Sequence, residues 1–334
     1  MAADCTGAPA CGIIPAALYD HSVMATDDLI TAITSLRTGR VGDHDRPHKP
    51  ALLLAILGLA EQGRLLENRV SYGPELFALF RRYLLAVRTD SDTVNMLDPF
   101  WRLRTDGILE PVPRAGFEQA IAARSTPPSV TELREITEGS RLPDSLFQQM
   151  NDPIHRDRLR DAIVSRYFAS HRSAIDQITQ EERSIGECER QLEQTGDSTV
   201  ADGAPEPVRE QAFRRVVLRA YDYRCAACGL RVIVDDLALV EAAHLIPWAE
   251  CRDDDPRNGI ALCKNHHWAM DQYLIAPTPD AQPAWMVSRY LDDRIEGQRE
   301  MLDLKGRSVL LPRESRFYPK RPALAWRRDR LLRH

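Results

Sequence analysis

The sequence predicts a mainly α-helical protein with small β elements, that is, an α+β fold. The chain has 334 residues, which is enough for two domains at about 150 residues each. Hydrophobic residues make up 43% of the chain and charged residues 28%, a balance that is typical of globular proteins. Apolar residues recur at helical spacing in several segments, and we find no internal repeat.

Composition also narrows the classes of protein to consider. The longest apolar run, Ala51–Ala60, is half of the roughly 20 residues that span a bilayer, so we expect no membrane span. The first twenty residues hold no Lys or Arg, and a secretory signal is therefore not expected. Seven cysteines without an export signal favour a reducing compartment and a cytoplasmic protein. The net charge of −5 means that a nucleic-acid partner must be bound by local basic patches.

Three helices and one extended segment are predicted before residue 170. Pro50 opens the clearest helix and Gly63 ends it, because proline is favoured in the first helical turn and glycine at a helix end. Its apolar residues lie all round, so we expect it to be buried. Further helices are predicted over Gly73–Val87 and Leu159–Phe168. The Pro99–Leu109 stretch, which contains Asp-Gly, predicts a short strand or a turn.

The composition changes after residue 170. Residues 171–207 hold nine acidic and three basic residues; the first half predicts a continuing helix and the second half a linker. A new unit begins with a helix from Val208. The last 35 residues hold ten Lys or Arg and four Asp or Glu. This tail is either an arm that tracks phosphates or a solvated face that packs on the preceding domain.

Two pairs of metal-binding residues predict a structural zinc site. Cys225 and Cys228 are followed, after 34 intervening residues, by Cys263 and His266, and two residues separate the members of each pair. A tetrahedral Zn²⁺ site needs four such donors, and each pair forms a tight knuckle. The alternative is a pair of small buried thiols, which the second knuckle argues against.

Residues within and after this zinc loop suit the hydrolysis of a phosphodiester. The reaction needs a base that deprotonates water, a cation near the phosphate and a group that orients the base. His244, at an expected strand end, suits the base, and Asn258 suits a turn that fixes a neighbouring histidine. On a helix His267 points about 100° away from His266 and can face a groove, and Asp271 shares its face. A lone histidine or Asn-Gly pair is usually structural; the order His, Asn, His around two knuckles favours catalysis.

Residues 208–275 resemble an HNH endonuclease domain of the ββα-metal fold, in the zinc-stapled form of McrA-type restriction enzymes. The resemblance lies in the motifs AAHLIPW, DDDPRNGIALC and HHWAMDQYLI. It implies that His244 is the general base, that Asn258 is the orienting residue and that His267 binds a catalytic Mg²⁺ or Mn²⁺.

One position departs from that family. Many HNH enzymes place a metal-binding Asp directly before the catalytic histidine, whereas Ala243 stands here. We expect Asp271, or alternatively Glu241, to supply the missing carboxylate. The other interpretation of Asp271 is a cap or a salt bridge near the end of the helix.

Two motifs before residue 110 combine cations with apolar residues. Arg46, His48 and Lys49 precede the buried helix, and three cationic side chains beside a helix N-terminus suit a phosphate. The alternative for them is an ordinary solvated loop. A later run places a proline and two aromatic residues next to arginine. The alternative interpretation of this run is a core strand with flanking surface charge. The residues of this run are Pro99, Phe100, Trp101 and Arg102.

Residues 27–168 resemble the sulfur-binding domain of phosphorothioation-dependent restriction enzymes, through RPHKPALLLAIL and PFWRLRTDG. The resemblance implies that this domain recognises DNA in which sulfur replaces one phosphate oxygen, and that the HNH domain cuts nearby. Sulfur is polarisable and a poor hydrogen-bond acceptor, so a proline ring with adjacent aromatic carbon can contact it. The cations would hold neighbouring phosphates, and some would reach guanine edges. Asp98 departs from the family, in which a tyrosine often precedes the proline.

The sequence thus predicts a type IV-like restriction endonuclease that acts on phosphorothioated double-stranded DNA, with structural Zn²⁺ and catalytic Mg²⁺ or Mn²⁺. One alternative is an HNH endonuclease directed at methylated bases, for which we see no pocket for a flipped base. Another is a non-catalytic, zinc-stabilised DNA-binding module, which would not need the His–Asn–His trio. A homodimer would help to make a double-strand break, although nothing in the sequence requires one. The predicted segments are a flexible leader (1–25), the DNA-reading domain (26–170), a helical acidic linker (171–207), the HNH domain (208–290) and a basic extension (291–334).

Overall fold

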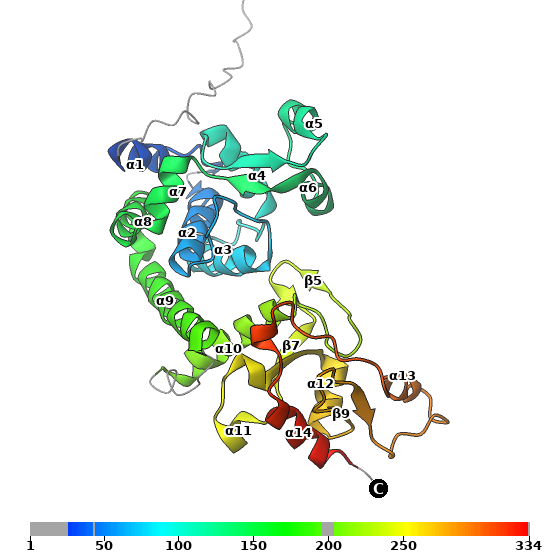
Figure 1. Ribbon diagram of the computed structural model, residues 1–334. Coiled ribbons are helices and arrows are strands. Elements are labelled where there is room, and N and C mark those ends of the chain that lie inside the picture. Colours follow the sequence, from blue (N-terminus) through cyan, green and yellow to red (C-terminus); the bar gives the residue numbers. More distant parts are fainter. Residues whose placement is uncertain (1–25, 43, 196–203, 333–334) are drawn as a thin grey trace, which may run out of the picture. The chain divides into compact units, whose positions relative to one another are not determined.

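The computed structural model describes residues 26–42, 44–195 and 204–332, and the chain divides into two compact units (Figure 1). The predicted leader, residues 1–25, lies outside the described residues. The first unit contains the residues up to Leu57, Leu65–Tyr72 and Arg88–Ala169. The second contains Gly58–Arg64, Gly73–Val87 and the residues from Ser170 on. The helix over residues 74–87 therefore belongs to the second unit, although the sequence suggested that it lies in the N-terminal domain.

Helices dominate both units, and the strands of the described residues form small two-stranded antiparallel sheets, so the predicted α+β class is confirmed. In the part of the chain that the structure describes, no helix combines the length and the apolar character needed to cross a membrane. The elements of the first unit are α1 (Thr26–Thr34), β1 (Arg40–Val41), β2 (His44–Asp45), α2 (His48–Glu61) as far as Leu57, α4 (Leu97–Arg102), the 3₁₀ helix η2 (Leu103–Asp106), β3 (Glu110–Pro113), α5 (Glu118–Ala123), α6 (Val130–Ile136), β4 (Thr137–Arg141), α7 (Asp144–Asn151) and α8 (Pro153–Tyr167).

The second unit contains the end of α2 and one further helix from the N-terminal half of the sequence, and otherwise follows the chain from residue 170. Its elements are α3 (Pro74–Val87), α9 (Arg172–Thr195), α10 (Glu206–Ala220), β5 (Ile233–Val234), β6 (Leu237–Ala238), β7 (Val240–His244), α11 (Trp248–Cys251), η5 (Pro256–Asn258), β8 (Gly259–Cys263), α12 (Lys264–Asp271), β9 (Ile275–Pro277), β10 (Trp285–Val287), α13 (Arg299–Leu302), η6 (Ser315–Phe317) and α14 (Arg321–Arg330). The short 3₁₀ helix η3 (Ala169–His171) lies where the units meet in the sequence.

Helix α2 confirms the predicted buried helix. All side chains from residue 51 to residue 57 are fully buried. The helix begins at His48, two residues before Pro50, which therefore lies in the first turn, where its missing N–H is not needed. Gly63 has a φ of +70°, and its N–H donates to the carbonyl of Ala60, so glycine ends the helix as predicted.

The prediction of a strand or turn over Pro99–Leu109 is wrong. Residues 97–102 form α4, and η2 follows until Gly107 ends it with a φ of +70°. Pro99 is the third residue of α4, where a proline is tolerated because no intrahelical N–H bond is lost. Phe100 and Trp101 are each 1% exposed, so burial of two aromatic side chains stabilises a helix that local propensity does not favour.

The centre of the second unit is the β7–β8 hairpin, against which α10 and α12 pack (Figure 1). Its register pairs Val240 with Cys263 and His244 with Gly259. A Cβ on Gly259 would lie 2.4 Å from Val217 Cγ2 and 2.9 Å from Phe213 Cζ, both on α10. Glycine at this position therefore allows α10 to approach the end of β7 closely.

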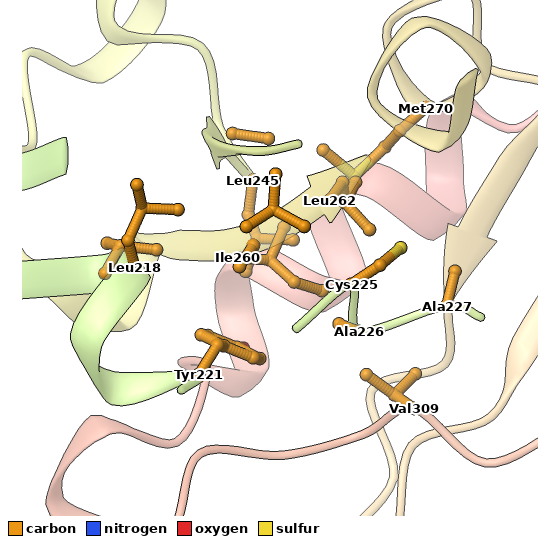
Figure 2. Close-up of a cluster of buried hydrophobic side chains, with 14 of the residues drawn as sticks. Leu218, Tyr221, Cys225, Ala226, Ala227, Leu245, Ile260, Leu262, Met270 and Val309 are labelled. Carbon is orange, nitrogen blue, oxygen red and sulfur yellow. The ribbon is translucent and has the colours of Figure 1, made fainter. Parts of the chain in front are cut away.

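A hydrophobic core joins α10, the hairpin and the first zinc knuckle (Figure 2). Leu218 of α10, Ile260 and Leu262 of β8, and Met270 of α12 are all less than 4% exposed, and Cys225 lies among them. Burial of such side chains contributes about 1.5–3 kcal/mol each. The same core that stabilises the hairpin therefore positions Cys225, one of the predicted zinc ligands.

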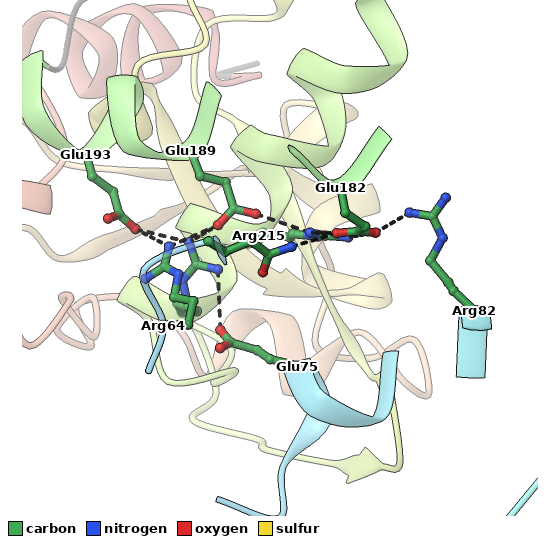
Figure 3. A network of polar contacts seen from close by, with 9 residues as sticks. Arg64, Glu75, Arg82, Glu182, Glu189, Glu193 and Arg215 are labelled. Atoms are coloured by element: carbon green, nitrogen blue, oxygen red, sulfur yellow. Dashed lines mark hydrogen bonds and ion pairs between the residues drawn. The ribbon is translucent and has the colours of Figure 1, made fainter. Parts of the chain in front are cut away.

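Helix α9 confirms the predicted helix after residue 170, but it is more than a linker, because its buried glutamates face arginines (Figure 3). Arg215 Nη1 donates to Glu182 over 2.8 Å, Arg219 Nη2 donates to Glu189 over 2.7 Å, and Arg82 also pairs with Glu182. Burial alone would raise the pKa of Glu182, yet Arg215 and Arg82 together hold it below its usual range. Removing one partner of such a buried pair costs about 3–5 kcal/mol, so α9, α10 and α3 are held together by charge.

Candidate functional site

The four predicted zinc ligands come together. The ligand atoms of Cys225, Cys228, Cys263 and His266 all lie within 4.8 Å of one another. His266 Nδ1 is 3.0 Å from Cys263 Sγ and 3.5 Å from Cys225 Sγ. Ligands about 2.3 Å from a tetrahedral zinc ion lie about 3.8 Å apart. Three thiols and one imidazole at this spacing fit a structural Zn²⁺.

Backbone contacts fix the first knuckle. The N–H of Gly229 donates to the carbonyl of Cys225 over 2.8 Å, with Gly229 at a φ of +75°. The N–H of Ala226 donates to Ala261 of β8 over 2.8 Å. A hydrogen bond from Cys263 is the largest of the effects that lower the pKa of Cys225, to about 3. The cluster thus favours one thiolate, at Cys225, while burial and the neighbouring thiols raise the pKa values of Cys228 and Cys263.

His244 is the last residue of β7, as predicted, and lies in a rigid setting. Its ring stacks on Phe213 of α10, with the centroids 4.0 Å apart and the planes 5° from parallel. Its Nε2 lies 3.1 Å from Oδ1 of Asp254. Asp254 is 4% exposed and also accepts a hydrogen bond from Arg209 over 2.6 Å. Asp254 belongs to the DDDPRNG run, but no local signal in the sequence marks it as a site residue.

Asn258 ties two loops together, as its place before a glycine predicted. It is 1% exposed, and its Oδ1 accepts from the N–H of Ile246 over 2.9 Å. Its Nδ2 donates to the carbonyls of Ile246 and Asp253 over 3.0 Å and 2.9 Å. The backbone carbonyl of Asn258 accepts from the N–H of Leu245, directly after His244. All these bonds fix the chain beyond His244.

His267 lies between two carboxylates. Its Nδ1 is 3.0 Å from Glu241 Oε2, and its Nε2 is 3.3 Å from Asp271 Oδ2. Neighbouring ligands about 2.1 Å from an octahedral Mg²⁺ lie about 3.0 Å apart, so His267 Nε2 and Asp271 Oδ2 have a spacing that fits one ion. Glu241 on the other ring nitrogen fits a partner that orients the histidine. His266, by contrast, faces the zinc cluster, so the two histidines point apart as predicted.

Arg327 of α14 connects these residues, and no local signal in the sequence identified it. Its side chain is 2% exposed, and its Nη2 donates to the carbonyl of His244 over 2.8 Å and to Asp271 over 3.2 Å. Its Nη1 donates to the carbonyl of Met270 over 3.1 Å. This part of the basic tail therefore braces the nuclease motif. Burial lowers the pKa of Arg327, against the opposing effect of Asp271.

The first unit contains a cavity of about 710 Å³ whose lining is rich in arginine. Arg37 and Arg46 are exposed, and neither has an ion pair with a carboxylate among the described residues. Pro99 lines the same cavity, although most of its surface is buried. The lining residues are Arg37, Thr38, Gly39, Arg40, Arg46, His48, Lys49, Thr93, Asn95, Asp98, Pro99, Arg102 and Thr105.

The predicted DNA-contacting residues differ in their availability. Lys49 is 8% exposed and donates to Asp106 over 2.5 Å, and His48 is bonded to the carbonyl of Thr93. Arg102 is half exposed and pairs with Asp98 over 2.8 Å. Phe100 and Trp101 are buried and are not among the described residues that line the cavity. Their predicted place in the apolar wall is therefore not what the structure shows, because both side chains enter the core of the first unit.

Comparison with known proteins identifies the class of the second unit. Residues 225–276 match the family model described as HNH endonuclease. The chain thus carries an HNH endonuclease domain, and the prediction of an endonuclease is confirmed. Among solved structures, one that resembles the chain is described as a modification-dependent TagI restriction endonuclease. The match has 21% sequence identity and a TM-score of 0.28. It covers 40% of this chain and 43% of that chain. This chain thus spans less than half the length of that protein, and no curated protein matches it.

Proposed function

We propose that this protein is a modification-dependent restriction endonuclease of the cytoplasm that recognises phosphorothioated double-stranded DNA and hydrolyses its backbone. The HNH domain supports the hydrolytic part. The observation that carries the recognition part is the cavity of the first unit, in which unpaired arginines and the ring of Pro99 line one space.

In the proposed reaction His244 is the general base. Its ring removes a proton from a water molecule while the water oxygen forms a bond to phosphorus. The bond from phosphorus to the 3′ oxygen breaks, and the 3′ oxygen leaves with the electron pair and takes a proton from solvent. A positioned base contributes about 10²–10⁴-fold to such a rate. Asn258 holds the following loop and so keeps the base in place.

We assign the catalytic Mg²⁺ or Mn²⁺ to His267 and Asp271, with Glu241 orienting His267. The spacing of Nε2 and Oδ2 supports Asp271 over Glu241 as the carboxylate that the sequence lacks before His244. A divalent ion held there would neutralise charge on the phosphate oxygens and on the leaving 3′ oxygen.

Recognition would combine charge with an apolar surface. Arg37 and Arg46 are available to phosphate oxygens, because no described carboxylate neutralises them. Pro99 offers an apolar ring in the same cavity, which suits sulfur better than oxygen because sulfur is larger and accepts hydrogen bonds poorly. The ion pair of Asp98 with Arg102 reduces the repulsion that this carboxylate would exert on a phosphate.

The test is a set of cleavage and binding assays on three duplexes of one sequence: phosphorothioated, methylated and unmodified, each with Mg²⁺ or Mn²⁺. We expect the phosphorothioated duplex to be bound most tightly and cut fastest. His244→Ala should lower the cleavage rate by about 10²–10⁴-fold and leave binding unchanged. Equal binding of all three duplexes would contradict the recognition part alone, and cleavage by His244→Ala at the unaltered rate would contradict the assignment of the base.

A further inference from the structure

The partner of His244 is a carboxylate that lies outside the His–Asn–His trio. Asp254 Oδ1 is 3.1 Å from His244 Nε2, and Asp254 is 4% exposed. We propose that Asp254 is a positioning residue, which fixes the proton of neutral His244 on Nε2 and thereby makes Nδ1 the atom that accepts the proton of water. The inference rests on the proposed role of His244 as the base.

The chemistry of the two groups sets the direction of the hydrogen bond. An ionised carboxylate can only accept, so Nε2 must carry the hydrogen that lies between them. Arg209 Nη1 donates to the other oxygen, Oδ2, over 2.6 Å and favours the ionised carboxylate. A neutral imidazole with its hydrogen on Nε2 has a lone pair on Nδ1. The tautomer that can act as a base at Nδ1 is thus selected by Asp254.

The rest of the setting leaves Nδ1 available. The side chain of His244 is 22% exposed, and in the described part of the chain no hydrogen bond to its Nδ1 is found. Stacking on Phe213 with near-parallel planes opposes rotation of the ring. The backbone of His244 is held as well, because the residue pairs with Gly259 in the hairpin and its carbonyl accepts a hydrogen bond from Arg327. One ring nitrogen is therefore held, and no hydrogen bond among the described residues occupies the other, in a side chain that is partly exposed.

Arg209 completes the arrangement as a clamp on Asp254. Its guanidinium carbon lies 4.7 Å from the centroid of the Trp248 ring, so packing as well as charge fixes the guanidinium. In the part of the chain that the structure describes, the charged groups that face His244 are Asp254 beside its ring, Arg209 behind that carboxylate and Arg327 at its backbone. When Nδ1 takes a proton, the imidazolium ion gains a carboxylate partner that is already in place, which favours the transfer.

The first experiment reads the tautomer directly in the full-length protein. Long-range ¹H–¹⁵N spectra of ¹⁵N-histidine-labelled protein distinguish a proton on Nε2 from one on Nδ1, and a His244→Gln sample assigns the signal. We expect neutral His244 to carry its proton on Nε2. In Asp254→Asn the amide can donate to Nε2, and we expect the proton to move to Nδ1. A wild-type proton on Nδ1 would overturn the proposal.

The second experiment measures cleavage and DNA binding by the same variant. We expect Asp254→Asn to lower kcat on the order of 10²-fold, within the contribution of a general base, with the Kd for DNA unchanged. Asp253→Asn removes a neighbouring charge in the same loop, where Asp253 pairs with Lys320 rather than His244, and should cut within about twofold of wild type. Equal rates for Asp254→Asn and Asp253→Asn would overturn the positioning role.

If Asp254→Asn leaves Arg209 without a partner and fails to fold, a double variant allows the same test. Arg209→Met with Asp254→Leu leaves no unpaired charge, and we expect a folded protein that cuts on the order of 10²-fold more slowly. Wild-type rates from it would overturn the proposal, and the wild-type spectrum decides if this variant also fails to fold. A proton on Nε2 together with full cleavage by His244→Ala would instead refute the assigned base, and with it the function proposed for Asp254.

Discussion

The nuclease motif of the second unit and the cavity of the first hold their polar side chains in opposite ways. His244, Asn258 and His267 each have side-chain hydrogen bonds to a carboxylate or to backbone groups. In the cavity, Arg37 and Arg46 have no such ion-pair partner among the described residues. The first arrangement fixes geometry before a substrate arrives, whereas the second, in the proposed recognition of DNA, leaves charge for a phosphate to neutralise.

Physical chemistry explains why the two regions differ. A general base must be oriented in advance, because reorganisation during the reaction would add to its barrier. An exposed arginine is solvated by water, so it is stable without an ion-pair partner. A phosphate that binds to it displaces its counterions and becomes that partner. The nuclease site should therefore be sensitive to small changes in its supporting residues. The cavity should respond to the number of its charges.

We expect the largest effect on stability and cleavage from the loss of a zinc ligand. Cys225→Ser removes a ligand that also lies in the core of the second unit, and structural zinc sites contribute about 10 kcal/mol or more of apparent folding free energy. We expect zinc content to fall from one ion per chain to near none, the melting temperature to fall by about 10 °C or more, and cleavage to be lost. Cys251→Ser, at an exposed cysteine outside the cluster, is the matched control. Unchanged melting and cleavage of the Cys225→Ser protein would mean that the cluster does not hold a structural ion.

The two carboxylates beside His267 should have unequal effects on the catalytic metal. Asp271→Asn removes a proposed ligand, and we expect the concentration of Mn²⁺ for half-maximal cleavage to rise by more than about 100-fold. Glu241→Gln removes an orienting partner and should raise it by about 10-fold, at the lower end of the range for such partners. Asp280→Asn, on the exposed end of a loop, is the control. The reverse order of effects would make Glu241 the ligand.

Sequence spacing was sufficient wherever function depends on residues close in the chain. The knuckles, the strand end at His244 and the shared helix face of His267 and Asp271 all follow from local periodicity, and the structure brings these atoms together. Asp254 and Arg327 could not be found in that way. They lie 10 and 83 residues from His244. Their positions depend on how a loop and a C-terminal helix pack on the hairpin.

In the first unit, the local structure of the Pro99–Arg102 segment was predicted wrongly. Aromatic residues beside proline and arginine suggested an extended segment, whereas tertiary burial makes it helical and turns Phe100 and Trp101 inward. The same packing leaves Pro99 and Arg102 on the cavity. Because a helix repeats every 3.6 residues and a strand every two, an error in the element reassigns which side chains face a ligand.

The smallest predicted effect concerns Arg46, and it tests whether the unpaired arginines of the cavity bind phosphate. Arg46→Ala removes one unpaired charge, so we expect affinity for duplex DNA to fall on the order of tenfold and the slope of log K against log salt to become shallower by about 0.9. The cleavage rate of saturated enzyme should not change, since Arg46 orients no catalytic group. Arg69→Ala in the same unit, whose guanidinium is already paired with Glu138, should leave the slope unaltered. If the two variants gave the same slope, the unpaired arginines of the cavity would not be what binds phosphate.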